Sequence, residues 1–238
     1  MMTEGLERAL VVTAHPDDVD FGAGGSVAKL AASGVAVSYC VITSGDAGGF
    51  DPQVPRTEIP RIRQAEQRAA GQALGVTDIH FLGYRDGELT VTHELRRDIS
   101  RVIRQVKPQL MLIQSPERNW ARIPASHPDH MAAGEAAIFS IYPDARNPFA
   151  HPSLLNDEGL DAWTVGEVWV MGAPDPDHFV DVTEFFDQKV AALRAHESQT
   201  AHMEDLPGFL RGWLAGTAQA AGFEEGRLAE AFKRAMMP

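Results

Sequence analysis

Residues 10–18 read Leu10-Val11-Val12-Thr13-Ala14-His15-Pro16-Asp17-Asp18, so an apolar run is followed directly by a polar turn. An apolar run of this length, rich in β-branched residues, predicts a short buried strand over residues 10–14. A helix is predicted from about Gly24 to Ser33, where Gly34 ends it. The stretch thus predicts a strand, a loop and a helix in succession.

The alternation of strands and helices continues along the chain. In the first half we predict strands over residues 35–43, 78–82 and 109–114 and helices over 59–74 and 93–106. Further on we predict a helix over 128–141, strands over 165–171 and 179–182, a helix over 183–196 and a helical C-terminal region. This order is typical of an α/β fold, here a Rossmann-like, mostly parallel sheet with helices on both faces.

Composition narrows the class of protein. The 238 residues fit one domain over residues 1–238, and the single cysteine, Cys40, lies in an apolar run that predicts a buried, inert thiol. The formal net charge of -12 and the lack of Lys/Arg clusters argue against a nucleic-acid partner, since such binding depends on neutralising phosphates. No apolar run approaches the ~18 residues of a membrane span and no signal-peptide pattern occurs, so we expect a cytoplasmic protein.

One apolar pattern near the C-terminus has two interpretations. Phe209, Leu210, Trp213 and Leu214 recur at helical spacing. Such a stripe ordinarily faces a core, but it is also compatible with a contact between subunits. A homo-oligomer therefore stays open.

Polar side chains follow each of the first four predicted strands. They lie within residues 15–18, 44–49, 84–88 and 115–130. In an open α/β sheet, ligands bind beyond the carboxyl ends of the strands. The four loops are therefore predicted to form one site.

Two of these loops combine histidines with carboxylates. His15 and Asp18 are three positions apart, and His127 and His130 have the same spacing. Imidazole and carboxylate suit Zn²⁺ and neighbouring divalent ions, and a catalytic zinc site takes three protein ligands and a base beside them. Aspartates at these positions could instead cap the following helices. Because both clusters occur at strand-to-helix turns at one end of the sheet, we favour a metal site.

A dinucleotide site is a competing interpretation of the first loop. Gly22-Ala23-Gly24-Gly25 follows a strand, but its spacing is not Gly-x-Gly-x-x-Gly, and no acidic residue ends the second strand. We expect these glycines to allow close packing between the helix and the strand.

Several segments together resemble the PIG-L/LmbE-like family of zinc-dependent N-deacetylases, which act on N-acetylglucosamine-containing compounds and related amides. The resemblance covers nearly the whole chain, and its most specific motifs are Ala14-His15-Pro16-Asp17-Asp18 and His127-Pro128-Asp129-His130. The weaker motifs are Gly24-Gly25, Ser44-Gly45-Asp46-Ala47-Gly48, Arg63-x-x-Glu66, Leu74-Gly75, Phe81-Leu82-Gly83-Tyr84-Arg85-Asp86-Gly87 and Ala195-His196-Glu197-Ser198-Gln199.

The resemblance implies a metal centre with a base beside it. Zn²⁺, or another divalent transition metal, would be held by His15, Asp18 and His130. Asp17 would act as the general base towards the attacking water.

The resemblance also implies roles for four further side chains. His127 would stabilise the oxyanion or protonate the departing amine, and Asp129 would hold His127 in orientation. Arg63 and Asp86 would bind sugar hydroxyls. His196 belongs to a motif but receives no role.

We therefore predict a zinc-dependent amidohydrolase that removes an acetyl group from a small N-acetylglucosamine-containing or related amino-sugar substrate. One alternative is an amidase that acts on a thiol-conjugate or antibiotic-type amide. Another is a non-catalytic sugar- or metal-binding protein. The spare carboxylate of Asp17 favours an enzyme, because a binding protein has no need of a base beside the metal.

Overall fold

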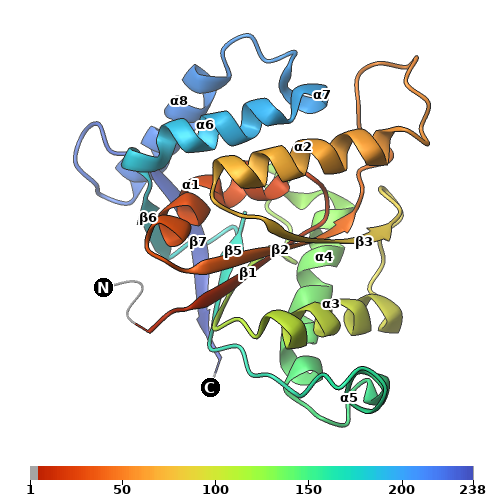
Figure 1. Ribbon diagram of the computed structural model, residues 1–238. Coiled ribbons are helices and arrows are strands. Elements are labelled where there is room, and N and C mark those ends of the chain that lie inside the picture. Colours follow the sequence, from red (N-terminus) through yellow and green to blue (C-terminus); the bar gives the residue numbers. More distant parts are fainter. Residues whose placement is uncertain (1–4, 238) are drawn as a thin grey trace.

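The computed structural model describes residues 5–237 and contains a seven-stranded sheet with the order β3-β2-β1-β4-β5-β7-β6 (Figure 1). The strands are β1 Arg8–Thr13, β2 Ala36–Thr43, β3 Asp78–Tyr84, β4 Leu110–Gln114, β5 Glu167–Met171, β6 His178–Asp181 and β7 Ala229–Met236. Strands β3, β2, β1, β4 and β5 are parallel, whereas β7 is antiparallel to both of its neighbours. The predicted α/β fold with a mostly parallel sheet is confirmed.

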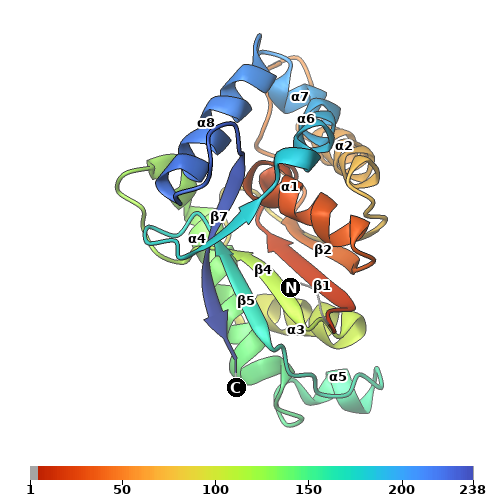
Figure 2. The ribbon, with the colours of Figure 1, turned by 90° about the vertical axis from the view of Figure 1, so that its left-hand side faces the viewer.

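Helices cover both faces of the sheet (Figures 1 and 2). One layer contains α1 Asp18–Ala32, α2 Ile59–Ala73, α6 Phe186–Ala195 and α8 Leu206–Ala220. The other contains α3 His93–Val106 and α4 Pro128–Phe139. The short helical segments are η1 Ile123–Ser126, η2 Ser140–Ala145, α5 Pro152–Asn156, η3 Thr183–Phe185 and α7 Glu197–Thr200. Each layer buries its own apolar cluster against the sheet.

Helix α1 begins at Asp18 rather than near Gly24. The backbone N–H groups of Asp20 and Phe21 donate to the carbonyl of Asp17 at 2.9 and 3.0 Å, which starts the helix directly after the loop. The glycines are tolerated inside the helix because they pack closely. An ideal Cβ on Gly25 would lie only 2.7 Å from the Cβ of Val182.

The C-terminal segment ends in a strand that the sequence did not predict. β7 follows α8 and lies between β5 and β6. Its Ala, Glu, Lys, Arg and Met residues are good helix formers, which is why local propensity favours a helix there. Pairing with two neighbouring strands overrides that preference. The helical part of the C-terminal region is therefore α6, α7 and α8.

The remaining fold predictions have clear outcomes. Cys40 is fully buried on β2, and burial raises the pKa of its thiol to about 12, so it is the inert thiol expected. On α8, Leu210 and Leu214 face the core, while Phe209 stays 52% exposed. None of the helices within residues 5–237 combines the length and apolar character that a membrane crossing needs.

Candidate metal centre and active site

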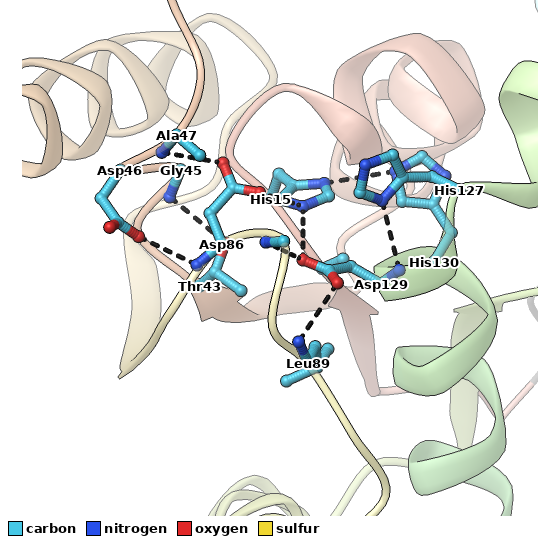
Figure 3. A network of polar contacts seen from close by, with 12 residues as sticks. His15, Thr43, Gly45, Asp46, Ala47, Asp86, Leu89, His127, Asp129 and His130 are labelled. Atoms are coloured by element: carbon cyan, nitrogen blue, oxygen red, sulfur yellow. Dashed lines mark hydrogen bonds and ion pairs between the residues drawn. The ribbon is translucent and has the colours of Figure 1, made fainter.

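Side chains from the loops after β1, β3 and β4 converge at one edge of the sheet (Figure 3). His15 lies in the middle of the group, with Asp86 on one side and His127 and His130 on the other. The ring centroids of the three histidines are 5.0 to 5.2 Å apart. The loop after β2 joins them, because Asp46 accepts the backbone N–H of Asp86 at 2.9 Å. The four loops therefore lie together at this edge, as expected.

Three side chains place their polar atoms at metal-ligand spacing. His15 Nδ1 lies 3.2 Å from His130 Nε2 and 3.3 Å from Asp18 Oδ2, and His130 Nε2 lies 3.0 Å from Asp18 Oδ1. Ligands 2.0 to 2.2 Å from a tetrahedral Zn²⁺ would be about 3.3 to 3.6 Å apart. The three predicted ligands thus fit such an ion with only small adjustments.

The turn that carries two of these side chains is fixed by its own hydrogen bond. The backbone N–H of His15 donates to Asp18 Oδ2 at 2.7 Å. Pro128 begins α4, so His130 lies in the first turn of that helix and faces the same point.

Charge in the cluster is arranged to hold a cation. Burial lowers the pKa of His15, but the carboxylates of Asp18, Asp129 and Asp86 outweigh burial and raise it to about 12. Burial also opposes charge on His130 and Asp18, yet their mutual attraction raises the pKa of His130 and holds that of Asp18 well below its usual range. The carboxylates therefore stabilise positive charge between them, whether it belongs to protons or to a metal ion.

The other nitrogen of His15 contacts two carboxylates. Nε2 lies 3.0 Å from Asp86 Oδ1 and 3.2 Å from Asp129 Oδ2 (Figure 3). A carboxylate at this position keeps the proton on Nε2, which leaves Nδ1 free to coordinate a metal. Asp86 and Asp129 thus orient His15.

Asp129 was expected to orient His127, but its carboxylate contacts His15. Its carboxylate is fully buried and, besides His15, accepts the backbone N–H groups of Gly87 at 2.7 Å and Leu89 at 3.2 Å. What Asp129 offers His127 is its backbone N–H, which donates to His127 Nδ1 at 3.2 Å. The backbone N–H groups of Gly87 and Leu89 hold the carboxylate towards the loop after β3. The carboxylate therefore contacts His15 in place of the expected contact with His127.

His127 lies at the edge of the cluster and is exposed. Because its Nδ1 accepts a hydrogen bond, the neutral ring carries its proton on Nε2. Burial, together with the nearby His15 and His130, lowers the pKa of His127. The neutral form, a donor at Nε2, is therefore favoured.

Asp17 has a strained backbone and a guanidinium beside it. Its φ of 86° lies in the left-handed region. Arg63, only 4% exposed, donates to the carbonyl of Pro16 at 2.7 Å and lies 3.3 Å from Asp17 Oδ2. Burial raises the pKa of Asp17 and Arg63 opposes that rise. These contacts keep a carboxylate next to the predicted ligands.

Arg63 and Asp86 are occupied by protein groups. Arg63 also donates to the carbonyl of Gly45 at 3.2 Å, and Asp86 also accepts the backbone N–H of Ala47 at 3.2 Å. Both side chains are buried. Their sugar-binding role stays a prediction, and the contacts observed are those of residues that hold the loops together.

A buried network behind Asp17 was not found from the sequence. Gln67 accepts the backbone N–H of Asp17 at 2.8 Å and donates to Asp20 Oδ2 at 2.8 Å, and His196 Nε2 lies 2.8 Å from the same oxygen. Arg63 and Gln67 are four positions apart and share one face of α2, which is a spacing that signals a common polar face. His196 thereby gains a place in the site, because it anchors the network that ends at Asp17.

A pocket of about 320 Å³ opens beside the predicted ligands. Asp18 and His130 line it, together with Phe21, Met171, Trp213 and Leu214. One wall of the pocket is thus apolar, while the predicted metal ligands Asp18 and His130 form part of another wall.

Comparisons with known proteins identify the family to which the chain is similar. A family model described as GlcNAc-PI de-N-acetylase (PIG-L) matches residues 10–140. The chain is 35% identical to diacetylchitobiose deacetylase of Thermococcus kodakarensis over 82% of this chain and 70% of that protein. It is 32% identical to a probable N-acetyl-alpha-D-glucosaminyl L-malate deacetylase 2 of Bacillus cereus over 92% of this chain and 97% of that protein.

The fold has a counterpart among solved structures. The N,N'-diacetylchitobiose deacetylase of Pyrococcus horikoshii, solved with an inhibitor, superposes with a TM-score of 0.89 and 30% identity, covering 98% of this chain and 85% of that one. The family model spans more than half of the chain, and the similarity to named deacetylases extends through most of the rest. This chain belongs to the PIG-L family of GlcNAc-PI de-N-acetylases.

Proposed function

We propose that this protein is a zinc-dependent N-deacetylase that removes the acetyl group from an N-acetylglucosamine-containing small molecule. The observation that carries the proposal is the spacing of His15 Nδ1, Asp18 and His130 Nε2, each 3.0 to 3.3 Å from the others, at the wall of a pocket. The relatives named above are deacetylases of diacetylchitobiose and of an N-acetylglucosaminyl malate, which supports this substrate class.

His15, Asp18 and His130 would hold the metal. Two imidazoles and one carboxylate form a donor set that suits Zn²⁺, with a fourth position left for water or substrate. When bound, Zn²⁺ would polarise the acetyl carbonyl and make water more acidic. Asp86 and Asp129 would keep His15 in the tautomer that coordinates through Nδ1.

Asp17 would take a proton from water while the oxygen of that water forms a bond to the acetyl carbon. Asp17 lies next to Asp18, and burial raises the pKa of its carboxyl group. This change suits a general base, because such a base works best when its pKa lies near the working pH. Arg63 would hold the carboxylate in place through the contact at 3.3 Å.

His127 would donate from Nε2 to the oxygen that becomes negative. Preorganised donors of this kind typically lower a barrier by about 3 to 4 kcal/mol. When the C–N bond breaks, the nitrogen would take up the proton that Asp17 removed from water, and the products would be acetate and the free amine of the sugar.

The test is hydrolysis by the purified protein loaded with Zn²⁺, with diacetylchitobiose and N-acetyl-α-D-glucosaminyl L-malate as substrates and amine release as the readout. We expect release of one acetate for each amine, and loss of activity when a chelator removes the metal. Metal binding without amine release from either sugar, at any metal loading, would count against the proposal and favour a binding protein. Amine release only from non-sugar amides would favour the amidase alternative.

Cellular location, domain number and oligomeric state stay predictions from the sequence. We propose a cytoplasmic enzyme with one domain that acts on a small molecule.

A further inference from the structure

One arginine side chain lines the pocket beside the predicted metal ligands and has no carboxylate partner among the described residues. Among the described residues that line it, Arg122 is the one lysine or arginine. Arg122 lies in the loop after β4, and its Cζ is 4.0 Å from the ring centroid of Trp213 on α8. Trp213 thus fixes the guanidinium at the pocket wall.

The acidic residues of the pocket are already occupied. Asp18 contacts His15 and His130. Glu230 Oε1 lies 2.7 Å from Lys189 Nζ, and its two oxygens accept the backbone N–H groups of Gly25 and Ser26 at 2.9 and 2.7 Å. Within residues 5–237, no carboxylate lies within ion-pair distance of Arg122.

The electrostatic surroundings of Arg122 agree with its geometry. Partial burial against the pocket wall lowers its pKa, and no nearby carboxylate opposes that effect. By contrast, Arg96 pairs with Asp144 at 2.7 Å and Arg101 pairs with Glu158 at 2.7 Å. Arg122 thus differs from Arg96 and Arg101, because it lies at the active-site pocket without a carboxylate partner in a chain that has 33 acidic residues.

We infer that Arg122 binds a carboxylate on the part of the substrate that lies beyond the acetylated sugar. A guanidinium presents two parallel N–H donors that match a carboxylate, and stacking on Trp213 leaves that edge free. The apolar wall formed by Phe21, Met171 and Leu214 would cover the carbon skeleton that carries the carboxylate. This inference rests on the proposed deacetylase function, which it narrows to acidic conjugates of the amino sugar.

The experiment compares two substrates of nearly the same shape, N-acetyl-α-D-glucosaminyl L-malate and its dimethyl ester. We expect the kcat/KM of the wild-type protein to be about 10- to 100-fold higher for the free acid than for the ester. Hydrogen bonds to a charged group typically strengthen binding by about that factor. In Arg122→Gln, the ratio of acid to ester should fall towards one.

Arg118→Gln is the matched control. Like Arg122, Arg118 is exposed and lies in the loop after β4, and its Cζ is 5.5 Å from the ring centroid of Trp120. Unlike Arg122, it does not line the pocket. This variant should keep the wild-type ratio.

The wild-type ratio alone can overturn the inference, so the test does not depend on the folding of a variant. Equal hydrolysis of acid and ester would exclude a carboxylate site at Arg122 and leave the proposed deacetylase intact. If the protein hydrolyses neither compound and does not hydrolyse diacetylchitobiose, the result would contradict both this inference and the proposed deacetylase function. A preference for the acid that persists in Arg122→Gln would assign the carboxylate to another group and overturn the role of Arg122.

Discussion

The side-chain carbonyl of Gln67 accepts the backbone N–H of Asp17 at 2.8 Å. Asp17 has a φ of 86°, a left-handed conformation that costs a residue other than glycine about 1 to 2 kcal/mol. Gln67 is itself oriented, because its amide nitrogen donates to Asp20, which also contacts His196. The candidate base is therefore held in a strained conformation by a buried chain of three side chains.

Replacing Gln67 with Glu should lower kcat while metal binding stays unchanged. A glutamate cannot donate to Asp20 and adds a like charge, so the acceptor for Asp17 moves. A displacement of about 1 Å can cost about 100-fold, and we expect a fall in kcat of about 10- to 100-fold. Steady-state kinetics and metal analysis would measure both quantities.

Gln72→Glu is the control for that substitution, since Gln72 is exposed on the same helix. His196→Gln should also lower kcat, and combining it with Gln67→Glu should cost less than the sum of the two effects, because both act through Asp20. Additive effects would mean that the two residues act independently.

Replacing Asp17 with Asn should abolish turnover and leave the metal in place. The amide has nearly the same shape but cannot take a proton, and general base catalysis contributes about 100- to 10,000-fold. Wild-type hydrolysis by this variant would remove Asp17 from the mechanism. Loss of metal would mean that Asp17, rather than Asp18, is a ligand.

Replacing Asp129 with Asn separates its two candidate roles. If its carboxylate orients His15, as the 3.2 Å contact indicates, metal affinity should fall about 10- to 100-fold. The measurement is a competition titration with a chelator. A fall in kcat with unchanged metal affinity would instead support the role that the family resemblance implies, through His127.

Replacing Glu230 with Gln should destabilise the fold. Lys189 is fully buried, and its ammonium lies 2.7 Å from Glu230. Removing one partner of a buried ion pair leaves the other charge uncompensated, which typically costs about 3 to 5 kcal/mol. Chemical denaturation would measure this. Asp175→Asn, which breaks an exposed contact with Lys233, should leave the unfolding free energy unchanged.

Replacing Gly25 with Ala should destabilise the fold by about 1 to 3 kcal/mol, because the new Cβ would lie 2.7 Å from Val182. The matched substitution is Gly216→Ala on α8, where a Cβ meets nothing within 4 Å. That variant should be neutral or about 0.5 to 1 kcal/mol more stable, since alanine favours a helix. Equal effects of the two changes would show that helix propensity, not packing, decides both.

The order of strands and helices follows from the sequence because its signals are local. The run 10–14 and the helix His93–Val106 can each be recognised within a few turns from periodicity, capping and glycine stops. The two histidine-carboxylate clusters are recognisable for the same reason, since their members are three positions apart. β7 is the exception, because its residues favour a helix and only its neighbours make it a strand.

What only the tertiary structure decides is which distant atoms meet. His15 and His130 are 115 positions apart, and Asp20 and His196 are 176 positions apart, yet each pair lies within hydrogen-bond distance. The contact of Asp129 with His15 and that of Arg122 with Trp213 depend on how α4 and α8 pack on the sheet. Local patterns name the residues that carry the chemistry, but the direction of each side chain is set by packing between segments that no local pattern relates.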